Sequence, residues 1–230
     1  MTRRQPIVAI DGPSGAGKST ISKLVAERLG FVYLDTGAMY RCVGWLSLEQ
    51  GIDPLDEAAV ATLLEDLQIQ FVRNEDGDQR VVCNGRDITS AIREHRVSQA
   101  ASKASSLPRV REKLVAMQRD MGVAGGVVME GRDIGTNVFP DAEIKVFLTA
   151  TAEERARRRV KQLVIAGREA DFDAILADQI ERDRRDSQRD LNPLVQAADA
   201  VVVDSTEWSI DRVVSHITAL AEAARHVYTP

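Results

Sequence analysis

The sequence predicts an α/β protein with three layers, in which helices flank a central parallel β-sheet. Short β-branched runs alternate along the chain with segments whose apolar residues recur at helical spacing, and this alternation is typical of parallel sheets. A glycine-rich segment at residues 12–17 separates the first strand from the first helix. A hairpin pattern at residues 69–83 interrupts the alternation, which indicates a small antiparallel β subdomain inserted into the core.

Two strand–helix units begin the predicted sheet. Residues 7–10 form a β-branched run typical of a buried parallel strand, and residues 18–29 carry apolar side chains at helical spacing. Residues 31–34 predict a second strand, and residues 38–48 predict a second helix. Two such units in succession favour a parallel sheet with helices on its faces.

The segment that follows breaks this alternation. Residues 51–54 read GIDP, and a short helical stretch is expected over residues 56–67. Apolar runs at residues 69–72 and 80–83 are then separated by the polar residues 74–78, as in a β-hairpin. Because a hairpin does not fit within a parallel core, we predict that residues 64–104 form an inserted subdomain. Residues 1–63 and 105–230 would then form the core.

The alternation resumes after the predicted insertion. We expect helices over residues 110–121, 152–165, 171–188 and 209–224, and strands over residues 127–129, 144–148 and 200–203. Ser209 is a suitable N-cap for the last of these helices, and Asp211 lies in its first turn.

Composition limits the classes of function. The chain has 44% hydrophobic and 28% charged residues, which is ordinary for a globular protein with one core and an inserted piece. Its formal net charge of -5 argues against a general nucleic-acid binder, because duplex affinity depends on excess positive charge. Any site for an anion must therefore be local.

Cysteine usage and the N-terminal segment predict the compartment. Cys42 and Cys83 lie far apart in the sequence and outside any C-x-x-C pattern, so neither a disulfide framework nor a zinc site is expected. The apolar stretch that follows Met1 is too short for a signal peptide or a membrane span. We therefore expect a cytoplasmic protein without a membrane partner.

Residues 12–19 read GPSGAGKS and match the phosphate-loop pattern G-x-x-x-x-G-K-S/T between a predicted strand and a predicted helix. Glycines allow backbone N–H groups to surround a phosphate, and the helix N-terminus adds partial positive charge. The pattern predicts a P-loop NTPase fold, with Lys18 at the β- and γ-phosphates and the Ser19 hydroxyl on Mg²⁺. The expected triphosphate-binding residues are Gly12, Pro13, Ser14, Gly15, Ala16, Gly17, Lys18, Ser19 and Thr20. The motif alone does not distinguish a kinase from a switch or a motor.

Three arginines share one face of a predicted helix. Arg155, Arg158 and Arg159 lie at positions i, i+3 and i+4, so they could close over a triphosphate as an arginine-rich lid at about residues 153–170. Arginine suits this task because its planar guanidinium binds two phosphate oxygens at once. The alternative is a solvated helical face on which these arginines pair with Glu153 and Glu154.

Charged residues also follow two predicted strands. Arg41 comes shortly after the strand at residues 31–34, and Arg132 and Asp133 follow the strand at residues 127–129. Parallel sheets bind ligands beyond the carboxyl ends of their strands, so these positions favour a functional role. Either Asp133 or Glu130 could position Mg²⁺ or its waters, because an acidic residue at the end of an apolar strand resembles the Walker B arrangement.

Asp186 and Arg189 form one more charged pair. They lie at positions i and i+3 in a very polar helical stretch. From this spacing alone, a surface salt bridge and a ligand-binding pair both remain possible interpretations.

Several ordered motifs closely resemble the bacterial cytidylate kinase family, and the resemblance extends over nearly the whole chain. They are residues 10–19, 34–41, 108–111, 130–136, 154–159 and 185–194. The resemblance implies phosphoryl transfer from ATP, with Mg²⁺, to CMP or dCMP. It also implies a three-part kinase made of a core, a lid and an enlarged monophosphate-binding region.

The resemblance further implies roles for individual residues. Arginines would hold the acceptor phosphate, Ser102 and Arg111 would help to read the cytosine edge, and Asp186 and Arg189 would meet the sugar. The acceptor-binding residues would be Asp35, Thr36, Tyr40, Arg41, Ser102, Arg111, Arg132, Asp133, Asp186 and Arg189. The catalytic residues would be Lys18, Arg132, Asp133, Arg155 and Arg159, and Arg158 would bind ATP.

We expect a monomer that acts on small molecules and binds neither nucleic acid nor membranes. Two alternatives remain: another P-loop small-molecule kinase, acting on uridylate or shikimate, and a P-loop NTPase switch without an acceptor. The hairpin and the set Arg41, Arg111 and Arg132 weigh against both. The N-K-x-D segment with which a GTPase reads its base does not occur in the sequence.

Overall fold

The structure is a computed structural model that describes residues 3, 5–73 and 79–225. The chain divides into two compact units. The first unit comprises residues 1–34 and 121–230, and the second comprises residues 35–120. The second unit contains the predicted insertion at residues 64–104 together with residues on both sides of it. The boundaries of that insertion stay a prediction.

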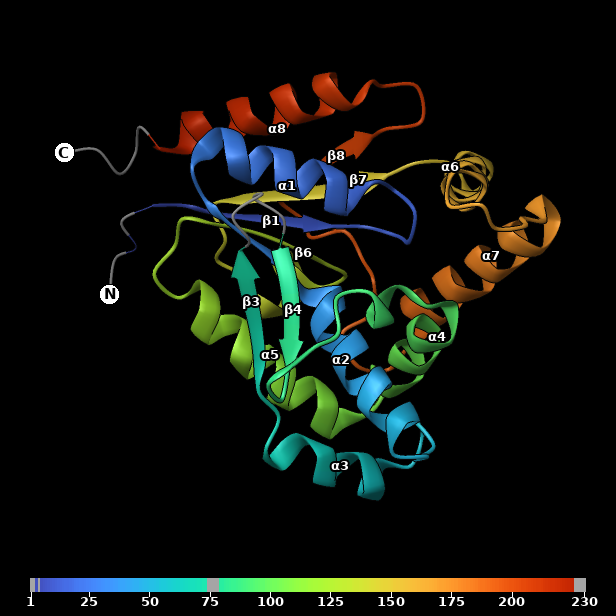
Figure 1. Cartoon of the computed structure of the whole chain (residues 1–230). Coiled ribbons are helices and arrows are strands. Elements are labelled where there is room, and N and C mark those ends of the chain that lie inside the picture. The colour runs from blue at the N-terminus through green and yellow to red at the C-terminus, as the bar shows by residue number, and fades with distance from the viewer. Residues whose placement is uncertain (1–2, 4, 74–78, 226–230) are drawn as a thin grey trace. The chain divides into compact units, whose positions relative to one another are not determined.

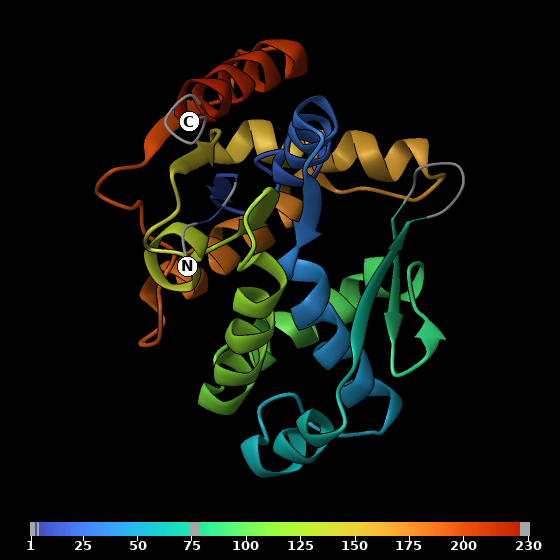
Figure 2. The ribbon, with the colours of Figure 1, turned by 90° about the vertical axis from the view of Figure 1, so that its left-hand side faces the viewer.

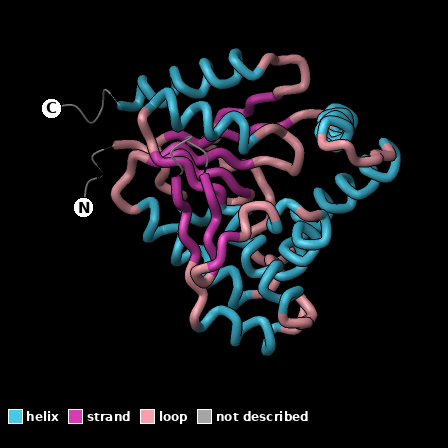
Figure 3. Tube along the Cα trace, viewed as in Figure 1, coloured by secondary structure: helices cyan, strands magenta, loops and turns pink. Residues whose placement is uncertain are grey.

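The first unit is built on a five-stranded sheet. Its strand order is β2 (Val32–Asp35), β6 (Val127–Gly131), β1 (Ile7–Asp11), β7 (Ile144–Thr149) and β8 (Val201–Asp204). β1 pairs in parallel with both β6 and β7, and β7 pairs in parallel with β8. The strands appear in magenta among the cyan helices in Figure 3. The predicted α/β class, with a central parallel sheet flanked by helices, is confirmed.

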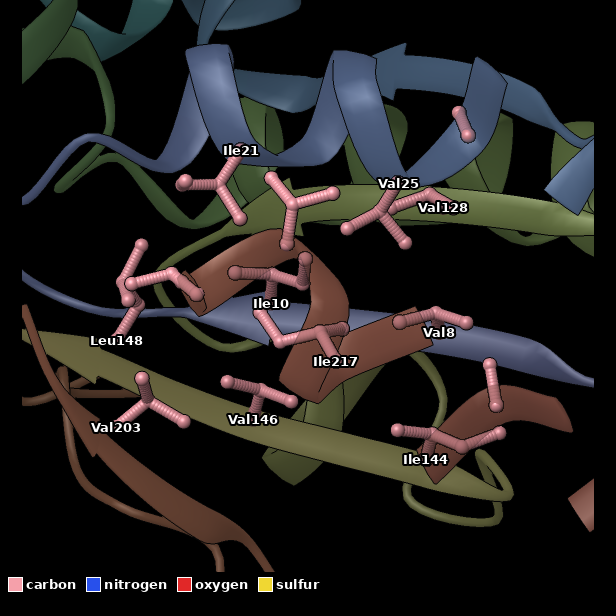
Figure 4. Packing of buried hydrophobic residues seen from close by; sticks show 14 of the residues in the cluster. Val8, Ile10, Ile21, Val25, Val128, Ile144, Val146, Leu148, Val203 and Ile217 are labelled. Carbon is pink, nitrogen blue, oxygen red and sulfur yellow. The ribbon is translucent and has the colours of Figure 1, made fainter. Parts of the chain in front are cut away.

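Helices α1 (Lys18–Leu29) and α8 (Ile210–Arg225) lie side by side over one face of this sheet (Figure 1). Their apolar side chains pack on the strands, as Figure 4 shows for Ile21, Val25 and Ile217. Val8 and Ile10 of β1 are fully buried beneath them. This cluster holds the end of β1 and the start of α1 in a fixed arrangement.

Two further helices of the first unit, α6 (Ala152–Ile165) and α7 (Phe172–Gln188), pack on each other. Thr151 caps α6 by accepting a hydrogen bond from the Glu154 amide, and Asp171 caps α7. Ser209 accepts a hydrogen bond from the Arg212 amide (3.2 Å), which confirms it as the N-cap of α8. A short π-helical turn, Ile134–Val138, follows β6.

The second unit combines helices with a small antiparallel sheet. Its helices are α2 (Thr36–Glu49), α3 (Glu57–Glu65), α4 (His95–Ala104) and α5 (Pro108–Gly122), and α5 ends two residues beyond the unit. The sheet has the order β3 (Ile69–Arg73), β4 (Gln79–Cys83) and β5 (Arg86–Asp87), with both pairings antiparallel. Figure 2 shows β3 and β4 as adjacent ribbons. The hairpin is confirmed, whereas its predicted turn at residues 74–78 lies outside the described residues.

Three short elements of the second unit were not predicted from the sequence. They are α4, β5 and a 3-10 turn at Ala91–Arg93.

The structure also bears on disulfides, membrane spans and metal sites. Cys42 and Cys83 are buried and free, and their thiols hydrogen-bond to each other within the second unit. Across the described ranges, no helix combines the length and the apolar character that a membrane crossing requires. No cluster of three or more His, Cys, Asp or Glu residues forms a metal site in the same ranges.

Candidate active site

The phosphate loop runs from the end of β1 at Asp11 to the start of α1 at Lys18, so the predicted strand–loop–helix context is confirmed. Gly12 has φ of 150°, and a Cβ atom there would lie 2.0 Å from the Leu148 carbonyl oxygen of the neighbouring strand. Gly15 has φ of 80°, in the left-handed region that favours glycine. The loop is therefore a tight backbone turn that side chains at these two positions would prevent.

Lys18 folds back over this loop. Its Nζ donates to the carbonyl oxygens of Gly12 and Pro13, each at 2.8 Å, and its side chain is buried. Burial and the charge of Arg132 lower the pKa of Lys18 to about 7, whereas the charge of Glu130 raises it. Its charged form is poorly stabilised in the free protein, so a phosphate bound beside Lys18 would stabilise that charge.

Asp11 is a site residue that the sequence predictions missed. Its two carboxylate oxygens accept hydrogen bonds from the backbone amides of Ile134 and Gly135, both at 2.8 Å. Burial raises the pKa of Asp11 to about 6, although those hydrogen bonds act in the opposite direction. The side chain thereby ties the strand before the phosphate loop to the segment that follows Arg132 and Asp133. Its place between a buried strand and the loop glycine was the available signal.

Two ion pairs join α7 to the segment after β6. Arg132 Nε lies 2.8 Å from Asp186 Oδ2, and Arg189 Nη2 lies 3.3 Å from Asp133 Oδ1. The ionic partners of Asp186 and Arg189 thus come from the segment after β6, and both side chains are largely buried. A surface salt bridge between Asp186 and Arg189 is therefore not what forms. Burial raises the pKa of Asp186, but the guanidiniums of Arg132 and Arg182 outweigh it and lower that pKa overall.

Arg182 is the second residue that the sequence predictions missed. Its charge lowers the pKa of both Lys18 and Asp186, so it lies close to the two groups. A signal was present, because Arg182 and Asp186 lie at positions i and i+4 on one face of α7, and Arg189 directly follows the last residue of that helix. The charges of Arg132 and Arg182 both act on Lys18, which lies at the phosphate loop.

The three predicted lid arginines have different surroundings. Arg155 is buried and donates to the Ser14 carbonyl oxygen of the phosphate loop at 2.9 Å. Arg158 donates to the Ala16 carbonyl oxygen at 3.4 Å and pairs with Glu154 at 3.1 Å. Arg159 instead hydrogen-bonds to Gln162 of its own helix. The structure brings Arg155 and Arg158 to the loop and leaves Arg159 on the helix surface.

Oxygen ligands for Mg²⁺ are present among the predicted site residues. Ser19 is exposed in the first turn of α1, which fits the expected role of its hydroxyl. Glu130 is buried at the end of β6 and accepts a hydrogen bond from the Tyr33 hydroxyl. Asp133 accepts a hydrogen bond from Asn137 Nδ2 at 3.1 Å. These hard oxygen donors fit a magnesium ion, and both carboxylates remain candidates to position it.

The second unit carries the remaining predicted residues. Asp35 accepts a hydrogen bond from the Ala38 amide, which caps α2, and pairs with Arg41 at 2.7 Å. The Arg111 guanidinium lies 5.7 Å from the centre of the Tyr40 ring and is buried. Two further residues, Thr36 and Ser102, lie in this unit, Thr36 buried at the start of α2 and Ser102 half-buried on α4.

Comparisons with known proteins agree with these motifs. Residues 8–223 match the family model described as cytidylate kinase. A bifunctional pantoate ligase/cytidylate kinase of Synechococcus sp. (strain CC9311) is 53% identical over 218 residues, which cover 94% of this chain and 44% of that protein. The chain therefore spans less than half the length of that relative. A cytidylate kinase of Pelotomaculum thermopropionicum is 47% identical over 220 residues, covering 96% of this chain and 97% of that protein.

Solved structures agree with the fold. A gluconokinase from Sinorhizobium meliloti 1021 gives a TM-score of 0.50 at 17% identity, covering 99% of this chain and 98% of that one. An uncharacterized protein from Eubacterium ventriosum gives 0.52 at 12% identity, covering 95% and 99%. At such identities the likeness concerns the fold alone. The family match over most of the chain, together with the relatives of about half identity, shows that this chain belongs to the cytidylate kinase family.

Proposed function

We propose that this chain transfers the γ-phosphoryl group of ATP to the phosphate of CMP or dCMP, forming CDP or dCDP. Membership of the family supports the proposal, as does the name of the Pelotomaculum relative, which this chain matches over nearly its full length. The observation that carries it is the tight phosphate loop, over which the buried Lys18 side chain folds back to the carbonyl oxygens of Gly12 and Pro13.

Electrostatic repulsion is the main obstacle in such a transfer. Both substrates are polyanions, and the second pKa of a phosphate monoester is about 6, so the acceptor is largely dianionic at neutral pH. An oxygen of the acceptor phosphate attacks the γ-phosphorus, the bond from that phosphorus to the β,γ-bridging oxygen breaks, and ADP leaves with the electron pair. Fixed positive charge that is already in place lowers the barrier to this step.

The phosphate loop residues, with Thr20 and Arg158, would bind ATP. The tight turn at Gly12 and the folded position of Lys18 support this role, because the loop backbone is shaped before any ligand arrives. The Ser19 hydroxyl would hold Mg²⁺, with Asp133 or Glu130 acting on its waters. When bound, Mg²⁺ would neutralise phosphate charge and help to orient the triphosphate.

Acceptor binding would use the residues that the family motifs supply. The proposed set is Asp35, Thr36, Tyr40, Arg41, Ser102, Arg111, Arg132, Asp133, Asp186 and Arg189. Arg41 and Arg132 each pair with a carboxylate of the protein. The acceptor phosphate would therefore either replace that carboxylate or bind the same guanidinium beside it. Cytosine offers an amino donor where uracil offers a carbonyl acceptor, so polar partners placed for one leave an unpaired group with the other.

The proposal is tested by supplying the purified chain with Mg-ATP and one acceptor at a time while ADP release is followed. We expect turnover with CMP and dCMP, and much slower turnover with UMP, AMP or shikimate. ADP release that needs no acceptor would instead support the switch without an acceptor. Preferred use of UMP or shikimate would support the other kinase classes.

Two variants separate donor from acceptor functions. Lys18→Ala should lower kcat by roughly 10²- to 10³-fold with little effect on folding, because it removes a cation at the transferring group. Arg189→Ala should mainly raise KM for the acceptor. Lys161→Ala, at an exposed position of α6, is the matched control and should behave as the unsubstituted protein. A normal rate for Lys18→Ala would contradict the role of the loop.

All proposed site residues come from one chain, so we propose that the protein acts as a monomer. We also propose that it works in the cytoplasm, because neither a signal peptide nor a disulfide framework is expected from the sequence. Sedimentation of the purified protein at the concentration used for the assays checks the oligomeric state. A dimer as the only active species would contradict this part of the proposal.

A further inference from the structure

Arg155 contacts the protein on every side of its guanidinium. Nε donates to the Ala150 carbonyl oxygen (3.0 Å), Nη1 donates to the Ser14 carbonyl oxygen (2.9 Å), and Nη2 lies 2.7 Å from Asp183 Oδ2. The side chain is 6% exposed. Its geometry is that of an internal connector between α6, α7 and the phosphate loop.

The same helix face holds the loop at a second carbonyl group. Arg158 Nη1 donates to the Ala16 carbonyl oxygen, and so does the buried Ser205 hydroxyl at 3.2 Å. Arg158 also donates to Ser205, through Nη1 to Oγ and through Nη2 to the carbonyl oxygen. Donors from outside the loop thus hold the carbonyl groups of two alternate loop residues, Ser14 and Ala16.

These contacts determine the direction of the loop amides. A trans peptide unit is planar, and its C=O and N–H bonds point in opposite directions. Holding the Ser14 carbonyl outward therefore turns the Gly15 N–H inward, and holding the Ala16 carbonyl does the same for the Gly17 N–H. Inward N–H groups are the groups that surround a phosphate in such a loop. Glycine has the greatest conformational freedom of all residues, so contacts from outside the loop are needed to hold a glycine-rich backbone in one conformation.

Helix α7 keeps Arg155 in place. Asp183 is its ionic partner, and Gln179, one turn earlier, is buried and donates to the Arg155 carbonyl oxygen at 3.4 Å. Arg155 Cβ also lies against Gly15, where an added Cβ atom would be 3.1 Å away. The chain of contacts runs from α7 through Arg155 to the peptide that follows Ser14.

We propose that Asp183 and Arg155 are positioning residues that orient the N–H groups of the phosphate loop for the triphosphate. The inference rests on the proposed function, and it gives Arg155 a different role from the direct contact with the transferring phosphate that the motif suggests. Asp183 acts through Arg155, and Arg155 acts through the Ser14 carbonyl group. Neither residue needs to touch the reacting atoms.

The test compares Asp183→Asn, Asp183→Glu and Arg155→Met in the full chain. Hydrogen exchange of the segment at residues 12–19 is measured in the free protein, and MgADP binding is measured by calorimetry. We expect Asp183→Asn and Arg155→Met to speed exchange in this segment and to weaken MgADP binding, each by roughly tenfold. KM for CMP should change by less than about twofold, and Asp183→Glu should recover part of the loss.

Arg184→Met is the matched control, because Arg184 lies beside Asp183 in sequence but is exposed and pairs with Glu181. It should leave exchange and MgADP binding unchanged. If Arg155→Met does not fold, the results for Asp183→Asn alone test the proposal. Normal exchange and binding in Asp183→Asn would overturn the proposal, as would faster exchange over the whole first unit or a loss confined to KM for CMP. Exchange and MgADP binding involve no acceptor, so they stay informative if CMP proves not to be the substrate.

Discussion

At the scale of single residues, the phosphate site holds cations close together before any anion is present. Lys18 is buried near Arg132 and Arg182, and both arginines lower its pKa. Glu130 and Asp11 offset part of this repulsion. The arrangement costs stability in the free protein and favours a polyanion, which is how preorganised charge contributes to phosphoryl transfer.

Burial and the neighbouring arginines lower the pKa of Lys18, which predicts proton uptake when a nucleotide binds. The pKa of Lys18 is about 7 in the free protein, so at pH 8 most of its amino groups are neutral. A bound phosphate would raise that pKa toward the ordinary value for lysine, about 10.4, so binding at pH 8 should take up close to one proton. Calorimetry of MgADP binding in buffers with different ionisation enthalpies measures this number. The uptake should be small at pH 6, where Lys18 is already charged.

Lys18→Met provides the control for that measurement. The variant should bind MgADP more weakly, and its binding enthalpy should not vary with the buffer. An unsubstituted protein whose enthalpy at pH 8 is the same in all buffers would contradict the prediction.

At the scale of elements, α7 organises much of the site in the first unit. Arg182 and Asp186 lie one turn apart on the helix, and Arg189 directly follows its last residue. Asp186 and Arg189 pair with the segment after β6. Asp183 holds Arg155 of α6. The polar stretch at the end of α7 thus supplies ionic partners both to the segment after β6 and to α6. These pairings account for many of its charged residues.

A second element relation concerns α2 and α4 in the second unit, where Gly44 allows close contact. A Cβ atom at Gly44 would lie 2.6 Å from the Ala101 amide nitrogen and 3.0 Å from the Val97 carbonyl oxygen. Gly44→Ala should therefore lower the free energy of unfolding by about 1–3 kcal/mol, although alanine gains about 1 kcal/mol in helix propensity. Urea denaturation measures the change.

Glu49→Ala, at the exposed end of the same helix, is the control for Gly44→Ala. It should change the free energy of unfolding by less than about 0.5 kcal/mol. A Gly44→Ala protein more stable than the parent would contradict the prediction, because it would show that α2 and α4 can move apart without lowering the free energy of unfolding.

At the scale of the whole molecule, the charge is acidic overall and basic locally. The net charge is -5, yet 24 of the 30 basic residues are arginines. Arg132, Arg155 and Arg189 each have a carboxylate partner, which limits self-repulsion while keeping positive charge at the site. Such a distribution favours local sites for small anions, and we expect no general affinity for nucleic acids.

The division into two units predicts that residues 35–120 fold as a separate fragment. This unit is continuous in sequence and has its own buried residues, among them Val43, Leu46, Val60, Leu64, Val81, Ile92, Val97 and Leu114. A unit of this size should have a stability of about 5 kcal/mol, at the low end for folded domains. Trp45 is buried and is the only tryptophan between residues 35 and 120, so its fluorescence reports cooperative unfolding. Val97→Asp should abolish the transition, and a fragment without a cooperative transition would contradict the prediction.

The sequence by itself determined most of the strands and helices along the chain, and it determined the phosphate loop. Both depend on local patterns: β-branched runs, apolar residues at helical spacing, and glycines between β1 and α1. The short helix α4 was missed although its buried residues Val97, Ala100, Ala101 and Ala104 have helical spacing. The family motifs supplied the residues proposed to bind the acceptor, and their roles stay a prediction.

Only the tertiary structure decided which charged groups meet. The sequence placed Asp186 beside Arg189, whereas folding pairs Asp186 with Arg132, 54 positions away, and joins Arg155 to Ser14, 141 positions away. Folding also places Asp11 against the amides of Ile134 and Gly135, and it lets the charge of Arg182 act on Lys18. Helical spacing shows which side chains share a face, but the partner of a buried charge depends on packing between distant elements. Desolvation and the need to pair each buried charge then select the contacts.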